Sequence, residues 1–208
     1  MKIVEPSFEI LYPHPSDRAH SPLLLEIAGR TCYKSETDIN EDSAAAFVTR
    51  LIESGHESVI EHFNITVKFI CDRGVSHELV RHRLVSYSQE STRYCDYSGE
   101  VTFIQPFFWQ RGSVGYVVWK RLCEAAEEAY KNLRKVGSPP EQARVVLPNS
   151  LKTEIVVTAN LREWRHILKL RTAKRAHPQM REIMVPLLKQ LAEEIPCVFG
   201  DILTALEE

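Results

Sequence analysis

One segment of the chain alternates strictly between apolar and polar side chains. From His62 to Cys71, apolar residues occupy every second position, beginning with Phe63, and polar residues fill most positions between them. Successive side chains of a strand point to opposite faces, so this pattern predicts a half-buried β-strand. A shorter alternation over residues 152–159 and the run at 101–104 predict two further strands.

Several predicted helices have recognisable ends. Ser21 and Asn160 are suitable N-caps, and Glu163 stands where a capping box with Asn160 needs an acid. Gly55 and Gly137 end two of the helices, because glycine readily adopts the left-handed conformation found there. The predicted helices span residues 22–33, 42–54, 75–82, 114–136, 140–144 and 161–171, with a last one beginning near 178.

The arrangement of these elements sets the expected fold class. Pro186 lies within the last helix and is expected to kink or divide it, because proline lacks an N–H and clashes with the preceding turn. Residues 84–100 show no periodicity and are predicted to form an ordered polar loop. Without regular strand-helix alternation, we expect an α+β (mixed α/β) fold in which helices cover a small, mostly antiparallel sheet, rather than a doubly wound parallel sheet. We expect one domain over residues 1–208.

Composition places the chain among ordinary globular proteins. Of its 208 residues, 44% are apolar and 26% are charged, which is sufficient for a sizeable core. The five cysteines are scattered and include no CxxC pair, as is typical of reduced thiols in a cytosol. No apolar run approaches the ~20 residues of a membrane span, and the N-terminal segment lacks the apolar core of a signal peptide. We therefore expect a soluble, cytoplasmic protein with no membrane partner.

Positive charge is concentrated in one segment, although the formal net charge is only -2. Between residues 162 and 181, the single acid Glu163 stands among many basic residues. Such runs usually form solvated helix faces, but arginine also presents a rigid fork of donors that matches phosphate oxygens. Because the whole chain is slightly acidic, a small nucleotide is favoured over a polynucleotide as the anion. The basic residues of this segment are Arg162, Arg165, Lys169, Arg171, Lys174, Arg175 and Arg181.

A second basic group lies near the middle of the chain. The tripeptide RHR at residues 81–83 is followed, after seven residues, by STR at residues 91–93, with Gln89 between them. These arginines, hydroxyls and the amide can together hold a phosphate and the edge of a heterocycle. Cations at the C-terminal end of a helix can also serve only to interact favourably with the helix dipole.

These motifs resemble those of a known family. The segment RHRLVSYSQESTR fills every position of the signature of the flavin-dependent thymidylate synthases, which is RHR, seven residues and S-x-R. HESVIEH at 56–62, ARVVLP at 143–148 and NLREWRHILKLR at 160–171 resemble further segments of that family in the same order. The resemblance implies methylation of dUMP to dTMP in dTTP biosynthesis. Methylenetetrahydrofolate would be the one-carbon donor, and NADPH-reduced FAD the hydride carrier.

The same resemblance implies a homotetramer, with FAD held between subunits and dUMP lying against the flavin ring. Family members often have glutamine at the position of Glu78, glutamate at that of Gln89 and asparagine at that of His166, so hydrogen bonding at these contacts differs here. By position, the implied FAD contacts are Ser58, Arg81, His82, Arg83 and Gln89, together with Asn160, Leu161, Arg162 and His166 from a neighbouring subunit. The implied dUMP contacts are Glu78, Arg81, Gln89, Glu90, Ser91, Thr92, Arg93, Arg144 and Arg171.

Arg171 is implied to be the catalytic residue. A guanidinium near the imide of uracil can stabilise negative charge there and so direct electron density to the ring carbon, which is otherwise a poor nucleophile. An arginine in the last turn of a helix can also act simply on the helix dipole. The sequence contains no GxGxxG or GxxxxGK motif, so arginines and histidines would have to neutralise the FAD pyrophosphate.

Other site chemistries are disfavoured. Cys197 has no neighbouring base or cation to lower its thiol pKa, so a buried structural cysteine is expected, and Ser91 also lacks an adjacent base. The histidines and acids of residues 56–82 form no HExxH or Cys/His pattern, so no metal is expected. Tyrosines between residues 87 and 97 leave open a binder of single-stranded nucleic acid, although no nucleic-acid partner is expected. A metal-dependent nucleotide hydrolase is a third alternative.

Overall fold

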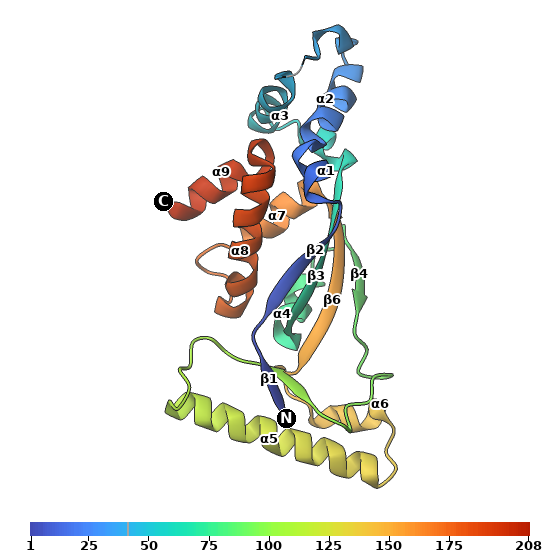
Figure 1. Ribbon diagram of the computed structural model, residues 1–208, viewed down its shortest axis with the longest axis vertical. Helices are drawn as coiled ribbons and strands as arrows, with labels where there is room; N and C mark the ends of the chain where they lie inside the picture. The colour runs from blue at the N-terminus through green and yellow to red at the C-terminus, as the bar shows by residue number, and fades with distance from the viewer. Residues whose placement is uncertain (41) are drawn as a thin grey trace. The chain divides into compact units, whose positions relative to one another are not determined.

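Four strands form the larger of two sheets, in the order β2-β3-β6-β4 (Figure 1). Their bounds are Ser7–Tyr12 for β2, Asn64–Asp72 for β3, Ser86–Gln89 for β4 and Lys152–Asn160 for β6. Neighbouring strands of this computed structural model run antiparallel, so the expected mixed fold with a small antiparallel sheet is confirmed. A second sheet pairs β1 (Lys2–Val4) in parallel with β5 (Thr102–Ile104).

The strands that follow a clear alternation lie where they are expected. In β3, the side chains of Ile65, Val67 and Phe69 are fully buried, while Asn64 is exposed. The prediction of a loop over residues 84–100 is wrong for β4, and β1 and β2 were not anticipated. The sequence of β4, SYSQ, is polar, and its backbone pairs with β6, a long-range contact that local periodicity cannot reveal.

The structure describes residues 1–40 and 42–208, and these divide into two compact units. Strands β3 and β6 carry residues of both units. The prediction of a single domain over residues 1–208 stays a prediction. The first unit consists of Met1–Phe8, Lys68–Arg81 and Tyr87–Val156, and the second of Glu9–Val67, His82–Ser86 and Val157–Glu208.

The first unit contains the long helix α5 (Val114–Lys135), with Ser113 as its N-cap. Its end is followed by Gly137, whose φ of 93° confirms the expected left-handed stop. Apolar residues of α5 pack into one buried cluster with Phe103 of β5. The other helices of this unit are α4 (Arg73–Leu79), α6 (Pro140–Ala143) and the 3₁₀ turn η3 (Arg144–Val146), of which α6 and η3 contact α5.

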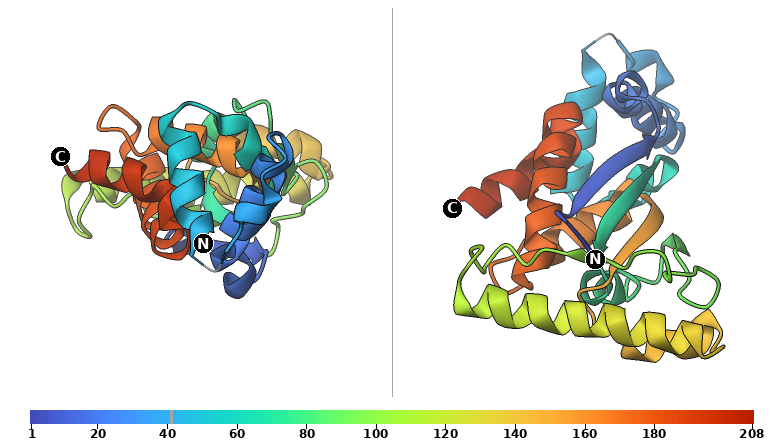
Figure 2. Two further views of the ribbon diagram at one scale, coloured as in Figure 1. Left: turned by 90° about the horizontal axis from the view of Figure 1, so that it is seen from above. Right: turned by 60° about the horizontal axis from the view of Figure 1, so that its bottom comes forward.

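The second unit consists mainly of helices. Helix α7 contacts η2, α8 and α9, and α2 contacts both α3 and η2 (Figures 1 and 2). Trp164 of α7 is fully buried and donates its Nε1–H to the backbone oxygen of Ile65 at 3.0 Å, which fixes α7 against β3. The helical elements are α1 (Pro15–Ala19), α2 (Ser21–Thr31), η1 (Glu36–Asp38), α3 (Ser43–Glu53), η2 (Glu57–His62), α7 (Leu161–Arg171), α8 (Pro178–Glu194) and α9 (Pro196–Glu207).

Two predicted helix boundaries are wrong. Ser21 is not the N-cap of α2, because its hydroxyl donates to the backbone oxygen of Arg18 at 2.7 Å and His20 takes the cap position. Helix α8 is not divided at Pro186 but ends at Glu194, next to Ile195, whereas a kink at Pro186 stays a prediction. Pro196 then begins α9, where its missing N–H costs no helical hydrogen bond.

The longest described helix, α5, has 22 residues and carries many charged side chains. Across residues 1–40 and 42–208, no helix has both the length and the apolar character that crossing a bilayer requires.

Candidate functional site

In the first unit, the structure joins two of the motifs that resemble the family. Arg144 of η3 donates its Nη1–H to the hydroxyl of Thr92 at 3.1 Å, although 52 positions separate the two residues. The backbone N–H of Arg93 donates to the hydroxyl of Ser91 at 3.3 Å, and the Arg93 guanidinium lies 3.5 Å from Glu141 in an exposed contact. Exposed cations beside hydroxyl groups make this surface chemically suited to a phosphate.

Glu90 is held firmly within the same unit. Its Oε1 accepts a hydrogen bond from the hydroxyl of Tyr97 at 2.8 Å, and its Oε2 accepts from Lys152 at 3.0 Å and from the backbone N–H of Glu154 at 3.2 Å. Burial, together with the Glu90 carboxylate, raises the pKa of Tyr97, so its hydroxyl stays a donor at neutral pH. These bonds fix the Glu90 side chain against Lys152 and Glu154 of β6. A direct contact between Glu90 and the nucleotide stays a prediction.

The remaining nucleotide candidates of the first unit lie around α4 and β4. Gln89 donates from its side-chain nitrogen to the hydroxyls of Ser76 at 2.9 Å and Thr153 at 3.2 Å. Glu78 lies half-buried near the end of α4, and Arg81 is exposed just beyond it. Gln89 is therefore oriented by α4 and β6 within this unit.

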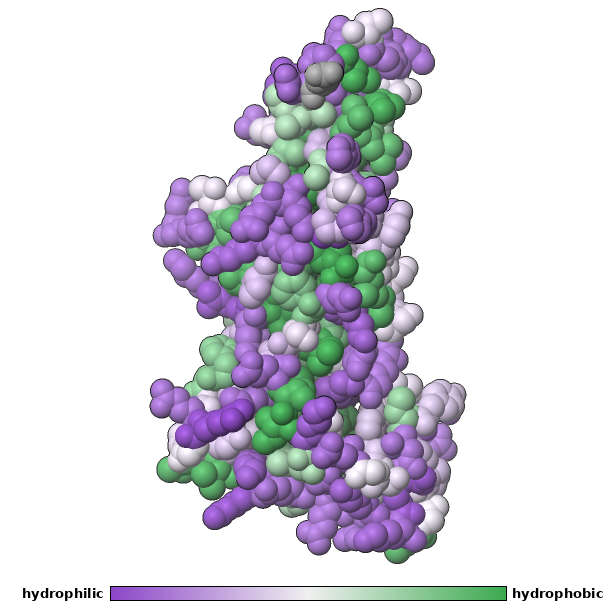
Figure 3. All heavy atoms as spheres, viewed as in Figure 1, coloured by the Kyte–Doolittle hydropathy of each residue, from purple (hydrophilic) through white to green (hydrophobic). Residues whose placement is uncertain are grey.

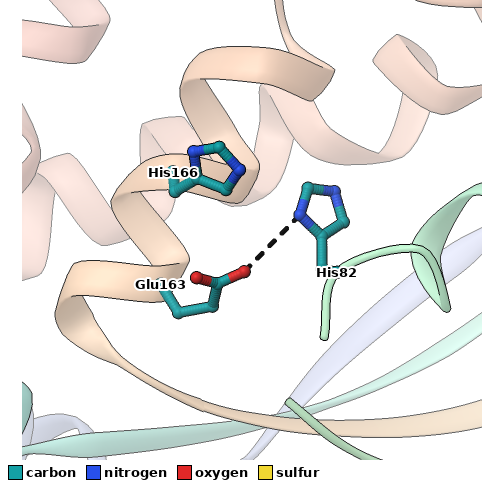
Figure 4. A group of neighbouring side chains, drawn as sticks. All are labelled: His82, Glu163 and His166. Atoms are coloured by element: carbon teal, nitrogen blue, oxygen red, sulfur yellow. Dashed lines mark ion pairs between the residues drawn. The ribbon is translucent and has the colours of Figure 1, made fainter. Parts of the chain in front are cut away.

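In the second unit, three side chains come together beside the start of α7 (Figure 4). The Asn160 side chain caps this helix by accepting the N–H of Glu163 at 2.9 Å, so the predicted cap is confirmed. The Glu163 carboxylate faces His82, with 3.5 Å between Oε1 and Nδ1. The rings of His82 and His166 meet edge to face, with 5.5 Å between their centres. We call His82, Glu163 and His166 the histidine cluster.

Arg171 connects to this cluster from the other end of α7. Its Nε–H donates to Nε2 of His82 at 3.0 Å. Burial, with further contributions from Arg171 and His166, lowers the pKa of His82 to about 4, so the imidazole is neutral at pH 7. Burial also raises the pKa of Glu163. The predicted catalytic arginine is thus bonded to a neutral histidine of the RHR motif.

The histidine cluster also has a donor set that a metal could use. One possible ligand atom from each side chain lies within 4.8 Å of the others. The Arg171 guanidinium, however, is already bonded to His82, and its positive charge opposes a second cation at the same place. The geometry gives no reason to prefer a metal here, and the expectation of a metal-free protein stays a prediction.

A cleft of about 850 Å³ opens beside α7 within the second unit. Arg162 on its wall donates to Glu61 at 2.6 Å, and its Nε lies 3.7 Å from Glu57. Two predicted flavin contacts are exposed, Ser58 on η2 and Arg83 directly after His82. A third, Leu161, is buried and donates its backbone N–H to the backbone oxygen of Phe63 in the same unit. The cleft is lined by Glu57, Glu61, Leu84, Asn160, Arg162, Glu163, Arg165, His166 and Lys169.

Not every arginine of the basic segment is available to a ligand. Arg165 is 2% exposed and forms two parallel hydrogen bonds with Asp201, of 2.6 and 2.8 Å. It therefore ties α7 to α9, and its charge is compensated within the fold. Arg181 donates to the backbone oxygen of Thr172 at 3.2 Å. The sequence alone suggests that both arginines are available to bind an anion. In the structure, each already donates to a protein oxygen.

Cys197 is half-buried, so the expectation of a buried cysteine is wrong in that respect, and its structural role stays a prediction. It lies in the first turn of α9, where burial raises its thiol pKa to about 11. A thiol with this pKa is protonated at neutral pH and is a weak nucleophile.

The sequence comparisons with known proteins identify one family, and a solved structure shares the fold. The family model described as thymidylate synthase complementing protein matches residues 17–197. A flavin-dependent thymidylate synthase of Mycobacterium tuberculosis is 33% identical over 207 residues, covering 91% of this chain and 82% of that protein. A protein of the same name from Pyrococcus abyssi is 38% identical over 159 residues, covering 74% and 65%. The crystal structure of a UMP/dUMP methylase from Streptomyces cacaoi, bound with 5-Br dUMP, shares the fold, with a TM-score of 0.80, 24% identity and coverage of 99% and 97%.

Proposed function

Because the chain belongs to the flavin-dependent thymidylate synthase family, we propose that it converts dUMP to dTMP. Methylenetetrahydrofolate supplies the carbon unit, and FAD reduced by NADPH supplies a hydride. The observation that carries the proposal is the contact between Arg144 and Thr92. This hydrogen bond joins the two segments that resemble the nucleotide-binding motifs of the family.

The dUMP phosphate is held by the exposed cations of the first unit. Arg93 and Arg144 supply charged donors, and Ser91 and Thr92 supply hydroxyl groups that can donate to phosphate oxygens. The other nucleotide contacts proposed from the family resemblance are Glu78, Arg81, Gln89, Glu90 and Arg171.

We propose that FAD binds in the cleft beside α7, whose wall carries both basic and acidic side chains. The volume of about 850 Å³ lies within the range of small-molecule sites, roughly 300–1,000 Å³. Asn160, Arg162 and His166 on its wall offer an amide, a guanidinium and an imidazole to a flavin nucleotide. Bound there, FAD would supply hydride transfer. The remaining flavin contacts proposed from the resemblance are Ser58, Arg81, His82, Arg83, Gln89 and Leu161.

Arg171 is the proposed catalytic residue. Its guanidinium binds the uracil ring and stabilises the negative charge that develops on the imide, which makes the ring carbon a better nucleophile. The bond to neutral His82 supports this role, because it orients the side chain without cancelling its charge.

The active assembly is a homotetramer with FAD sites shared between subunits. Apolar side chains are exposed in rows that another subunit could cover. In the first unit, Val114, Val118 and Leu122 lie along α5, each more than half exposed. In the second unit, Leu23 and Ile27 contribute to the apolar surface over α2 (Figure 3). Light scattering of the purified protein should give the mass of four chains, and a monomer at micromolar concentration would contradict the assembly.

A product assay tests the reaction. Purified protein is incubated with dUMP, methylenetetrahydrofolate, FAD and NADPH. The nucleotides are then separated by chromatography and identified by mass spectrometry. We expect dTMP in the complete mixture and none when the folate or the FAD is withheld. If the flavin-loaded protein leaves dUMP unchanged, the proposed reaction is wrong.

A further inference from the structure

Two arginines of α7 have partners of opposite character. Arg165 is bonded to the Asp201 carboxylate through two short hydrogen bonds, whereas Arg171 is bonded to the ring of His82. A carboxylate both orients a guanidinium and neutralises it. A neutral imidazole accepts a hydrogen bond without contributing a negative charge, so this bond orients the guanidinium without adding a negative charge beside it.

The bond to Arg171 determines which ring nitrogen of His82 carries the proton. The guanidinium of arginine is always protonated and can only donate, so Nε2 of His82 must be the acceptor. A neutral imidazole then has its single N–H at Nδ1. Nδ1 faces the Glu163 carboxylate at 3.5 Å, which is the side where a hydrogen-bond acceptor stabilises this tautomer (Figure 4).

Glu163 is itself well fixed. Its backbone N–H donates to the side-chain oxygen of Asn160, and only 8% of the surface of Glu163 is exposed. Glu163 and Arg171 are eight residues apart on α7, which is about 12 Å along the helix axis and slightly more than two turns. His82 belongs to a different segment of the chain. Its ring contacts the long side chains of both residues, the Glu163 carboxylate through Nδ1 and the Arg171 guanidinium through Nε2.

We propose that His82 is a positioning residue that orients the Arg171 guanidinium toward the pyrimidine, and that Glu163 holds His82 in the tautomer that can accept from Arg171. The proposal rests on the proposed function, because it assigns Arg171 to catalysis. Burial of the imidazole supports it, since protonated His82 would repel Arg171 and could no longer accept its hydrogen bond.

A double-mutant cycle distinguishes positioning from independent flavin binding. The turnover number for dTMP formation is measured at saturating dUMP and FAD, per mole of bound flavin, for His82→Leu, Arg171→Lys and the double variant. If His82 acts through Arg171, His82→Leu lowers turnover about tenfold or more in the wild-type background and less than twofold in the Arg171→Lys background. Effects that simply multiply would overturn the proposal.

Conservative variants give a second readout. Glutamine can accept from the Arg171 Nε–H, so His82→Gln should recover most of the turnover lost in His82→Leu. Glu193→Leu, which replaces an exposed acid on α8, is the matched control for Glu163→Leu, which removes the acceptor facing Nδ1 of His82. We expect Glu163→Leu to lower the turnover number with a smaller change in the KM for dUMP, and Glu193→Leu to change neither quantity. Equal loss in His82→Gln and His82→Leu would contradict positioning through Arg171.

The tautomer can be measured without any turnover. Protein labelled with ¹⁵N in the histidine rings is examined by NMR, with the His82 signals identified from their loss in His82→Gln. We expect the Nδ1–H tautomer in the wild type and in Arg171→Ala, where Glu163 still faces Nδ1, and a loss of this preference in the double variant Glu163→Leu/Arg171→Ala. An Nε2–H tautomer in the wild type overturns the inference even if dTMP is formed, whereas the expected tautomer without dTMP overturns only the proposed function.

Discussion

The arginines of the proposed phosphate surface and those of α7 differ in the partners that their guanidinium groups contact. On the phosphate surface, Arg144 donates to a hydroxyl and Arg93 makes a long, exposed contact with Glu141. On α7, Arg162 and Arg165 donate to carboxylates, and Arg171 donates to a neutral histidine. A cation keeps its attraction for an anionic ligand only where its protein partner is uncharged or weakly bound.

This difference teaches that the partner of an arginine, rather than the density of arginines, indicates where an anion can bind. The basic segment after Asn160 looks in sequence like the stronger phosphate site. In the structure, Arg165 of that segment is buried and bonded to Asp201, whereas the exposed Arg144 is bonded to the hydroxyl of Thr92. We therefore propose that the dUMP phosphate binds around Thr92 and Arg144 in the first unit, and that flavin contacts and the catalytic arginine lie on α7.

The largest expected effect concerns Arg171. Arg171→Ala should lower the turnover number for dTMP formation by about 10²–10³-fold, because it removes the cation that stabilises charge on the pyrimidine. Steady-state assays measure turnover, and flavin absorbance after gel filtration should show that most FAD stays bound. Arg175→Ala removes an exposed arginine just after α7 and should change turnover less than twofold. Similar turnover numbers in the two variants would contradict the claim that Arg171, and not Arg175, takes part in catalysis.

The next effect tests the assignment of nucleotide binding to the first unit. Arg144→Ala should weaken dUMP binding by about 10–100-fold, the loss typical of a hydrogen bond to a charged group, with FAD affinity unchanged. Isothermal titration measures both affinities. Arg121→Ala, on an exposed position of α5, serves as the control. A variant that loses FAD but binds dUMP normally would reverse the assignment.

The pH dependence of the free energy of unfolding tests whether His82 is neutral in the folded protein. The pKa of His82 falls from 6.5 to about 4 on folding, so between these values the unfolded chain binds a proton that the folded chain does not. The free energy of unfolding should therefore decrease as pH falls below 6.5, by about 1–3 kcal/mol near pH 4, and this loss should be absent in His82→Gln.

Urea unfolding at several pH values measures this difference. Burial raises the pKa of Glu163, which contributes the opposite slope as the pH rises above 4.5. Subtracting the variant from the wild type isolates His82, because Glu163 is present in both. Parallel curves for the two proteins would show that His82 is not a buried neutral group.

The smallest effect concerns the acids that cover Arg162. Glu61→Gln removes the carboxylate bonded to Arg162 and should strengthen FAD binding by about 2–5-fold, a small change because both side chains are largely exposed. Fluorescence quenching of FAD measures the dissociation constant, and Glu193→Gln provides a control for lost negative charge. Weaker FAD binding in Glu61→Gln would mean that Glu61 itself contacts the cofactor.

Local patterns predict the elements that local interactions stabilise. The alternation around Val67 predicts β3, and Asn160 predicts the start of α7, because strand faces and helix caps depend on neighbouring residues. The polar strand β4 was not predicted, since its pairing with β6 is the interaction that orders it. The sequence around Pro186 predicts a kink or a division of the last helix, and the structure shows that α8 is not divided there.

For the candidate site, the sequence indicates the residue types but not their partners. Glu61 was considered there only as a possible metal ligand, yet it pairs with Arg162, which is 101 positions away. The sequence presents Glu163 as part of a helix cap and as the single acid of a basic segment, and it gives no sign that the carboxylate faces His82. Ion pairs and side-chain orientation of this kind depend on the tertiary fold, and no spacing rule along the chain reports them.

The most direct test of the account is an anaerobic titration of the flavin in the purified protein. NADPH should bleach its absorbance, and the oxidised spectrum should return when dUMP and methylenetetrahydrofolate are added together, but not when either is added alone. Flavin that stays reduced with both substrates present, or a protein that binds no flavin, would contradict the claim that this chain couples flavin oxidation to methylation of dUMP.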